Sequence, residues 1–227
     1  MKAMILAAGR GERMRPLTDN TPKPLLKVGG KPLIVWHLER LAIAGFKEIV
    51  INHAYLGNQI EAALGNGAHW GLSIEYSAEN VALETAGGIA NALCLLAEQG
   101  NKSAPFLVVN GDTFTGIDFA TIKLPENMLA HLVLVDNPPQ HPQGDFAIEV
   151  NRLKNTGEHM LTFSGVGIYH PDLFANVVKG EPAKLAPLLR QAILDSRATA
   201  QHYRGVWHDI GTPERLQKLN RKLLKHA

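Results

Sequence analysis

The sequence predicts an α/β fold of three layers, in which helices cover both faces of a mostly parallel central sheet. Two observations lead to this prediction. Short apolar runs alternate with segments whose apolar residues recur at helical spacing, and this order continues through residues 3–110. Glycines and polar residues follow directly after the first and the fourth apolar run, where a parallel sheet binds its ligands. With 227 residues, 45% of them hydrophobic, the chain is long enough for one large core.

The first half of the chain contains the alternation. Met1–Ala8 is expected to be a buried strand, and Pro32 opens a helix that ends at Gly45, because proline fits the first turn of a helix and glycine its end. The further expected elements are a strand at 48–52, a short helix at 58–64, a strand at 72–76, a helix at 89–98 and a strand at 106–109.

The pattern changes after Val135. A proline-rich connector at 138–142 precedes two runs, 145–150 and 161–169, that we expect to be strands of a second layer. This part is too short for a core of its own, which favours a subregion over an independent domain. Two further helices are expected, each with a proline near its first turn, at 185–193 and 212–224.

Composition narrows the function classes. Lys and Arg exceed Asp and Glu by 23 to 21, a net charge of +2, which is too small to indicate a nucleic-acid partner. The single cysteine, Cys94, cannot form an internal disulfide, and its leucine neighbours predict a buried thiol. The N-terminal apolar stretch is too short for a signal peptide or a membrane span. We therefore expect a cytoplasmic enzyme with no membrane partner.

A glycine-rich turn follows the first strand. Gly9 and Gly11 allow backbone N–H groups to converge on an anion, and the cations Arg13 and Lys23 stand close by in the sequence. Walker and dinucleotide-binding loops fit poorly, because the first needs G-K-[ST] and the second a third glycine where Met14 stands. A lone G-x-G would favour an ordinary surface loop. The added cations and prolines favour a site for a nucleoside triphosphate.

Two aspartates stand at expected strand ends. Asp112 follows the strand at 106–109, and Asp209 precedes a turn and the last helix. Carboxylates are ligands that Mg²⁺ prefers, so the two could hold this ion beside a triphosphate. Each could instead cap a helix or form a turn.

The motif G-x-G-x-R-M-x-P-x-T at 9–18, followed by P-K-P-L at 22–25, resembles the signature of sugar-1-phosphate nucleotidylyltransferases, and the resemblance covers nearly the whole chain. It implies a Rossmann-like, glycosyltransferase-A-like fold with a small sugar-binding β subregion. We expect one nucleotidyltransferase domain, 1–227, in which 1–135 mainly binds the nucleotide and 136–227 mainly contributes the sugar-binding part and the terminal helix.

The resemblance also implies the reaction. An oxygen of a sugar 1-phosphate attacks the α-phosphorus of the nucleotide, pyrophosphate leaves, and no nucleophilic side chain is needed. The backbone of Gly9–Glu12 and the side chain of Arg13 are expected on the β- and γ-phosphates, and Lys23 on the α-phosphate and the sugar phosphate. Asp112 and Asp209 match the family's Mg²⁺ ligands.

Further site residues are expected by position in the family motifs. Thr85 is expected near the nucleobase, although it could simply cap the following helix. Relatives often have glycine where Glu84 stands, which leaves the base preference open. The expected nucleotide-binding residues are Ala8, Gly9, Gly11, Glu12, Arg13, Lys23, Glu79, Thr85, Ala86, Gly87 and Asn110. The expected sugar-binding residues are Gly144, Glu149 and Gly165.

The sugar is the least specified part of the prediction. An E-K-P motif that many relatives carry is missing here, which fits the short muramate-type enzymes of the family. The expected substrates are therefore UTP and N-acetylmuramate 1-phosphate. The alternatives are a mannose- or glucose-1-phosphate enzyme that uses another base, and a non-catalytic nucleotide-sugar sensor. A dinucleotide-dependent oxidoreductase is disfavoured, because Asn52-His53 stands where an acidic residue would end the second strand.

Overall fold

The computed structural model describes residues 1–98, 100–101 and 103–224. Its helices are α1 (Leu33–Ile43), α2 (Gly57–Leu64), α3 (Glu84–Leu96), α4 (Leu185–Leu194) and α5 (Pro213–Leu224). Its strands are β1 (Ala3–Leu6), β2 (Lys27–Val28), β3 (Lys31–Pro32), β4 (Glu48–His53), β5 (Ser73–Ala78), β6 (Phe106–Asn110), β7 (Thr113–Thr115), β8 (Ala130–Val135), β9 (Phe146–Glu149), β10 (Arg152–Lys154), β11 (Met160–Tyr169), β12 (Ala198–Tyr203) and β13 (Trp207–Asp209).

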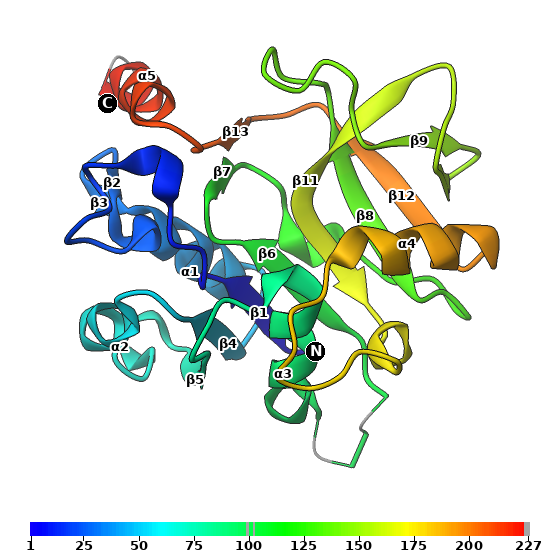
Figure 1. Cartoon of the computed structure of the whole chain (residues 1–227), viewed down its shortest axis with the longest axis horizontal. Coiled ribbons are helices and arrows are strands. Elements are labelled where there is room, and N and C mark those ends of the chain that lie inside the picture. The colour runs from blue at the N-terminus through cyan, green and yellow to red at the C-terminus, as the bar shows by residue number, and fades with distance from the viewer. Residues whose placement is uncertain (99, 102, 225–227) are drawn as a thin grey trace.

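Among the described residues, nine strands form one sheet in the order β5-β4-β1-β6-β11-β8-β12-β10-β9. Figure 1 labels all of these strands except β10. Strands β5, β4, β1 and β6 run parallel to one another. Strand β11, which follows β6 in the sheet, runs antiparallel to both β6 and β8. The predicted Rossmann-like α/β fold class is confirmed. The sheet is not mostly parallel as expected, because only β5–β4, β4–β1, β1–β6 and β8–β12 pair in parallel, whereas β9, β10 and β11 pair antiparallel with their neighbours. The carboxyl ends of β1, β4 and β6 consequently meet at one edge, where open α/β sheets bind ligands.

The expectation of a second layer for 145–150 and 161–169 is wrong. Their strands, β9 and β11, belong to the same nine-stranded sheet. Strand β11 is long enough to pair with β9 at Met160 and Leu161 and with β6 from Val166 onward. Because β9 also pairs with β10, the strands β11, β8, β12, β10 and β9 close into a ring instead of starting a new layer.

Helices cover both faces of the sheet, as the alternation predicts. Along β1, Met4 belongs to the core under α3 and α4, whereas Ala3 and Ile5 belong to the core under α1 and α2, because successive strand residues point to opposite faces. A third apolar cluster joins α5 to distant segments of the chain. Its buried members are Met14, Val28, Leu33, Phe114, Ile210, Leu216 and Leu219.

Helix α3 departs from two expectations. It begins at Glu84 instead of residue 89, because the helix contains Gly87 and Gly88, whose low helix propensity is overridden by close packing on neighbouring segments. Cys94, expected to be buried, is exposed, because α3 turns Ile89 and Ala92 toward the core and Cys94 away from it. Among the described residues, no helix is both long and apolar enough to cross a membrane.

Candidate active site

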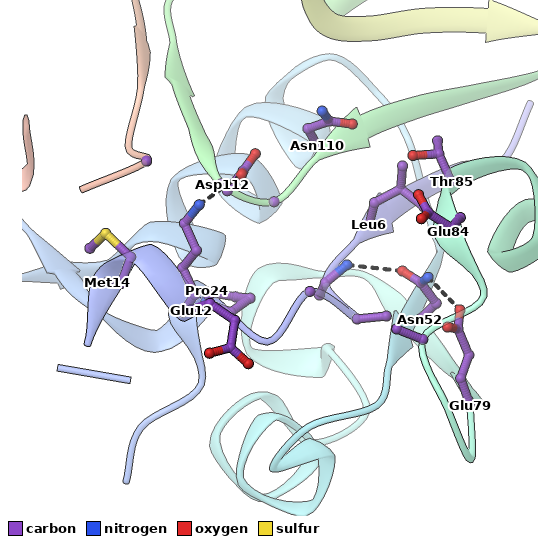
Figure 2. Close-up of a pocket in the computed structure, with 18 of the residues that line it drawn as sticks. Leu6, Glu12, Met14, Pro24, Asn52, Glu79, Glu84, Thr85, Asn110 and Asp112 are labelled. Carbon is purple, nitrogen blue, oxygen red and sulfur yellow. Dashed lines mark hydrogen bonds and ion pairs between the residues drawn. The ribbon is translucent and has the colours of Figure 1, made fainter. Parts of the chain in front are cut away.

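A cleft of about 430 Å³ lies at the carboxyl ends of β1, β4 and β6. Apart from Gly211, its lining comes from residues 6–112. Figure 2 shows Glu12, Pro24 and Asp112 on one side of this cleft and Glu79, Glu84 and Thr85 on the other. The lining residues are Leu6, Ala7, Ala8, Gly9, Gly11, Glu12, Arg13, Met14, Lys23, Pro24, Asn52, Glu79, Ala82, Leu83, Glu84, Thr85, Asn110, Gly111, Asp112 and Gly211.

The glycine-rich loop after β1 is held in place by its own hydrogen bonds. Gly11 has a left-handed φ of 68°, and its carbonyl accepts hydrogen bonds of 2.8 Å from the Met14 N–H and the Thr18 hydroxyl. Met14 is fully buried in the cluster under α5. A Cβ at Gly9 would meet no atom within 4 Å, so the backbone there is open to the cleft. This arrangement suits close approach of an anion to the main chain.

The two cations predicted for the loop have different surroundings. Arg13 is exposed at the cleft wall, and no carboxylate in residues 1–98, 100–101 and 103–224 forms an ion pair with it. The Lys23 side chain is only 9% exposed, and its Nζ lies 2.7 Å from Oδ2 of Asp112. A buried ammonium group needs such a partner, since an unpaired buried charge is strongly unfavourable.

A two-stranded ladder places the second aspartate, Asp209, on the backbone segment next to Asp112. Strand β13 runs antiparallel to β7 and pairs Asp209 with Thr113, and the Ile210 N–H donates to the Asp112 carbonyl at 3.0 Å. The sequence prediction that both aspartates stand at strand ends is confirmed, although Asp209 itself does not line the cleft. The Asp209 carboxylate forms an ion pair with Arg215 of α5.

A buried histidine supports this ladder from behind. His37 of α1 is 1% exposed, and its Nε2–H donates to the Thr113 carbonyl at 2.7 Å. Burial lowers the pKa of His37 to about 4, so the ring is neutral at physiological pH. A neutral donor thus fixes the backbone next to Asp112.

At the opposite end, a chain of hydrogen bonds forms the floor of the cleft. The Ala7 N–H donates to Oδ1 of Asn52 at 2.9 Å, and Nδ2 of Asn52 donates to Oε1 of Glu79 at 2.7 Å (Figure 2). The other carboxylate oxygen of Glu79 accepts the Leu83 N–H at 3.0 Å. Both oxygens of this buried carboxylate are therefore engaged, and they tie β1, β4 and the start of α3 together.

At the start of α3, one of the three residues expected at the nucleobase lines the cleft and the other two do not. Thr85 lines the cleft, as predicted. The structure does not bring Ala86 and Gly87 to it, because their backbone N–H groups both donate to the Ala183 carbonyl, at 2.9 and 3.1 Å. Glu84 lines the cleft with a left-handed φ of 59°, which is uncommon for a residue with a side chain.

None of the three residues expected at the sugar lines the cleft. Glu149 is largely exposed and pairs with Lys154 across the β9–β10 hairpin at 3.1 Å. Gly144 packs against Leu161, whose backbone N would be 2.9 Å from an added Cβ. Gly165 lies behind Asn110, because a Cβ there would be 2.6 Å from the Asn110 amide carbon. Only Gly165 therefore contacts a lining residue of the cleft.

Several lining residues were missed by sequence reasoning. Asn52 is the last residue but one of β4, which is parallel to β1, and its position near a carboxyl end was the signal that could have found it. Gly211 reaches the cleft only because β13 pairs with β7, for which the sequence gives no local signal.

The donor set suits a hard cation. No group of three or more His, Cys, Asp or Glu side chains gathers as a metal site in the described part of the chain. The ion pairs occupy Oδ2 of Asp112 and Oδ2 of Asp209, which leaves a second oxygen on each carboxylate. Mg²⁺ commonly binds through one or two carboxylates and completes its shell with water and substrate phosphates. The residues present fit this cation.

Comparisons with known proteins agree with this geometry. A model of the family described as nucleotidyl transferase matches residues 2–226. The chain is 57% identical over 227 residues, 96% of each chain, to N-acetylmuramate alpha-1-phosphate uridylyltransferase of Neisseria meningitidis serogroup B. It is 37% identical to the protein of the same name from Caulobacter vibrioides, over 93% of this chain and 92% of that one.

A solved structure supports the fold. It is a Bacillus anthracis protein in complex with sucrose, assigned provisionally as a glucose-1-phosphate thymidylyltransferase. The match has a TM-score of 0.82 with 21% identity and covers 98% of this chain and 95% of that one.

Proposed function

This chain belongs to the nucleotidyl transferase family, and from that premise we propose that it transfers UMP from UTP to N-acetylmuramate 1-phosphate. The products are UDP-N-acetylmuramate and pyrophosphate. The observation that carries the proposal is the ion pair of the buried Lys23 with the partly exposed Asp112, beside an open glycine loop, in a chain that shares 57% of its residues with a uridylyltransferase of this specificity. A role in bacterial cell-wall recycling, in the cytoplasm, follows from the same proposal.

The glycine loop and its cations would bind the triphosphate. Backbone N–H groups of Gly9–Glu12 and the guanidinium of Arg13 take the β- and γ-phosphates in this proposal, and the Lys23 ammonium takes the α-phosphate and the incoming sugar phosphate. The sugar-phosphate oxygen forms the new bond to the α-phosphorus while the bond to the β-phosphate oxygen breaks. The electron pair of that bond leaves with pyrophosphate, so placement of opposite charges performs most of the catalysis.

Asp112 and Asp209 would hold a Mg²⁺ ion through their carboxylate oxygens. Such an ion, when bound, supplies charge neutralisation for the phosphates and for the leaving group. The β7–β13 ladder keeps the two carboxylates on adjacent backbone segments, and the His37–Thr113 hydrogen bond holds that ladder against α1.

The floor of the cleft would bind the nucleobase. Thr85 and Ala8 keep their proposed contacts with the nucleotide, whereas Glu79 acts by holding Asn52 and the Leu83 backbone in place. We propose that residues 1–135 bind the nucleotide, which agrees with a cleft lining drawn almost entirely from residues 6–112. Residues 136–227 would contribute the sugar side, next to Asn110, against which the bulge of β11 at Gly165 packs.

Pyrophosphate release tests the proposal. The protein is mixed with Mg²⁺, one of ATP, CTP, GTP, UTP or dTTP, and one of several sugar 1-phosphates, including those of N-acetylmuramate, N-acetylglucosamine, glucose and mannose. Release with UTP and N-acetylmuramate 1-phosphate alone is the expected result. Release with another pair keeps the reaction and replaces the substrates, and no release from any pair contradicts the enzyme assignment in favour of a nucleotide-sugar sensor.

A further inference from the structure

The second aspartate of the proposed metal pair already has a cation bound to it. Arg215 Nη1 contacts Oδ2 of Asp209, and both side chains are about three-quarters buried. Asp112 has the same kind of partner in Lys23. Each carboxylate of the pair is therefore matched with one resident cation, and the four groups together carry no net charge.

The local sequence is built to let Arg215 reach Asp209. The Thr212 hydroxyl accepts the Arg215 N–H at 3.4 Å, and the Thr212 carbonyl accepts the Leu216 N–H at 3.1 Å, which fixes the first turn of α5. A Cβ at Gly211 would lie 2.7 Å from Arg215 Nη1 and 3.1 Å from Asp209 Oδ1. A side chain at position 211 would thus displace the guanidinium, and Gly211 itself lines the cleft.

The packing of helix α5 holds Arg215 beside Asp209. Leu216 and Leu219 are buried in the cluster that also contains Met14 and Ile210, so the helix is packed on the glycine loop and on the end of β13. The guanidinium consequently stays beside Asp209, and its positive charge acts on any cation that approaches this carboxylate. In a partly buried setting such a charge weakens cation binding appreciably, because solvent screens it less than at the surface.

We infer that Arg215 is a positioning residue that neutralises Asp209 and suppresses binding of a divalent cation until the triphosphate is present. This inference depends on the proposed function, since it assumes that Asp112 and Asp209 hold the ion. A divalent cation alone would add two positive charges to a neutral set of side chains. A triphosphate brings about four negative charges and removes this obstacle. Metal and nucleotide would therefore bind far more tightly together than separately.

Binding of Mn²⁺, measured by electron paramagnetic resonance with and without UTP, tests the inference without any turnover. Arg215→Gln keeps a hydrogen-bond donor but removes the charge, and we expect it to bind Mn²⁺ without UTP about tenfold more tightly than the unchanged protein. With UTP present, the two should agree within about threefold, because the phosphates dominate the charge. Arg215→Lys keeps the charge and should resemble the unchanged protein.

Arg221→Gln is the matched control, because Arg221 is exposed in the last turn of the same helix and loses the same charge. It should leave the Mn²⁺ affinity within about twofold, since exposed charges at that distance are screened. An unchanged or weakened Mn²⁺ affinity in Arg215→Gln would overturn the inference, as would an Arg215→Lys variant that behaves like Arg215→Gln. If the unchanged protein binds Mn²⁺ neither alone nor with UTP, the proposed metal pair itself fails, and this inference with it.

Discussion

Asp112 is 40% exposed, and its carboxylate touches a lysine that is almost fully buried. The sequence predicts the aspartate, because it follows an apolar run in a sheet whose strand ends hold ligands. It cannot predict the lysine as its partner. The two residues are 89 positions apart, and only the folded glycine loop brings Nζ of Lys23 to the carboxylate. Arg215 and Asp209 are only six residues apart, but their ion pair also could not be predicted from the sequence, because it depends on where α5 places the Arg215 side chain.

Asp112→Asn should lower kcat by two orders of magnitude or more, because an amide carries no charge to hold a divalent cation. Its remaining oxygen can still accept the Lys23 hydrogen bond, but the buried ammonium loses its counter-charge, so the free energy of unfolding should fall by about 2 kcal/mol. Steady-state kinetics and chemical denaturation check both parts. Asp195→Asn, at an exposed aspartate after α4, is the control and should match the unchanged enzyme. Full activity in Asp112→Asn would remove this residue from the site.

Lys23→Ala should raise the KM for the sugar 1-phosphate more than the KM for UTP. The nucleotide keeps the loop backbone and Arg13 in this variant, whereas the sugar phosphate loses its proposed cation. Varying each substrate at saturation of the other separates the two values, with the exposed Lys123→Ala as the control. Equal changes in both KM values would contradict the assignment of Lys23 to the sugar phosphate.

At the scale of elements, α3 explains where local pattern succeeds and where it fails. The sequence predicts α1, α2, α4 and α5 and the strands β1, β4, β5, β6, β9 and β11 within a few residues, because their apolar spacing is set by the faces they bury. It does not predict the strands β8, β10 and β12. The predicted start of α3, residue 89, is later than its observed start at Glu84, because a Gly-Gly pair normally disfavours a helix. The pair is needed by neighbours that are distant in sequence. A Cβ at Gly88 would lie 2.7 Å from Glu79 Oε1 and 2.8 Å from Asn52 Nδ2, and one at Gly87 would overlap the Glu181 carbonyl.

The two glycines should respond differently to alanine. Gly87→Ala forces a backbone segment to move, so the free energy of unfolding should fall by about 2 kcal/mol, with a nearly unchanged KM for UTP in the protein that folds. Gly88→Ala disturbs the Asn52–Glu79 pair at the floor of the cleft and should raise the KM for UTP about tenfold. Denaturation curves and kinetics of both variants provide the comparison, and identical effects would show that the floor does not meet the nucleotide.

At the scale of the whole molecule, the last helix packs on the first loop. Figure 1 shows α5 beside β2 and β3, and the cluster that contains Leu219 also contains Met14 of the glycine loop. The sequence predicts the helix α5 but not its partner, because the spacing of its buried leucines is the same whatever surface they cover. The order of the sheet is equally unpredicted, since β11 enters between β6 and β8 from a late part of the chain.

Stability against acid should depend on the contact between α1 and the β7–β13 ladder. His37 is buried, and burial lowers its pKa from 6.5 to about 4 against the opposing effects of the Thr113 carbonyl and Asp112. Between these two values the unfolded chain binds a proton that the folded protein does not, so the free energy of unfolding falls as pH falls through this window. The full loss due to this one group is about 3 kcal/mol, since each pKa unit corresponds to about 1.4 kcal/mol.

His37→Gln removes the titrating ring but keeps an amide donor for the Thr113 carbonyl. Urea denaturation at several pH values between 4.5 and 7.5 should therefore give a flatter dependence in the variant than in the unchanged protein. Burial also lowers the pKa values of His131 and His208, which remain in both proteins, so the difference between the two curves isolates His37. Two parallel curves would mean that His37 accepts a proton in the folded state, in which case the β7–β13 ladder would keep its contact with α1 after protonation.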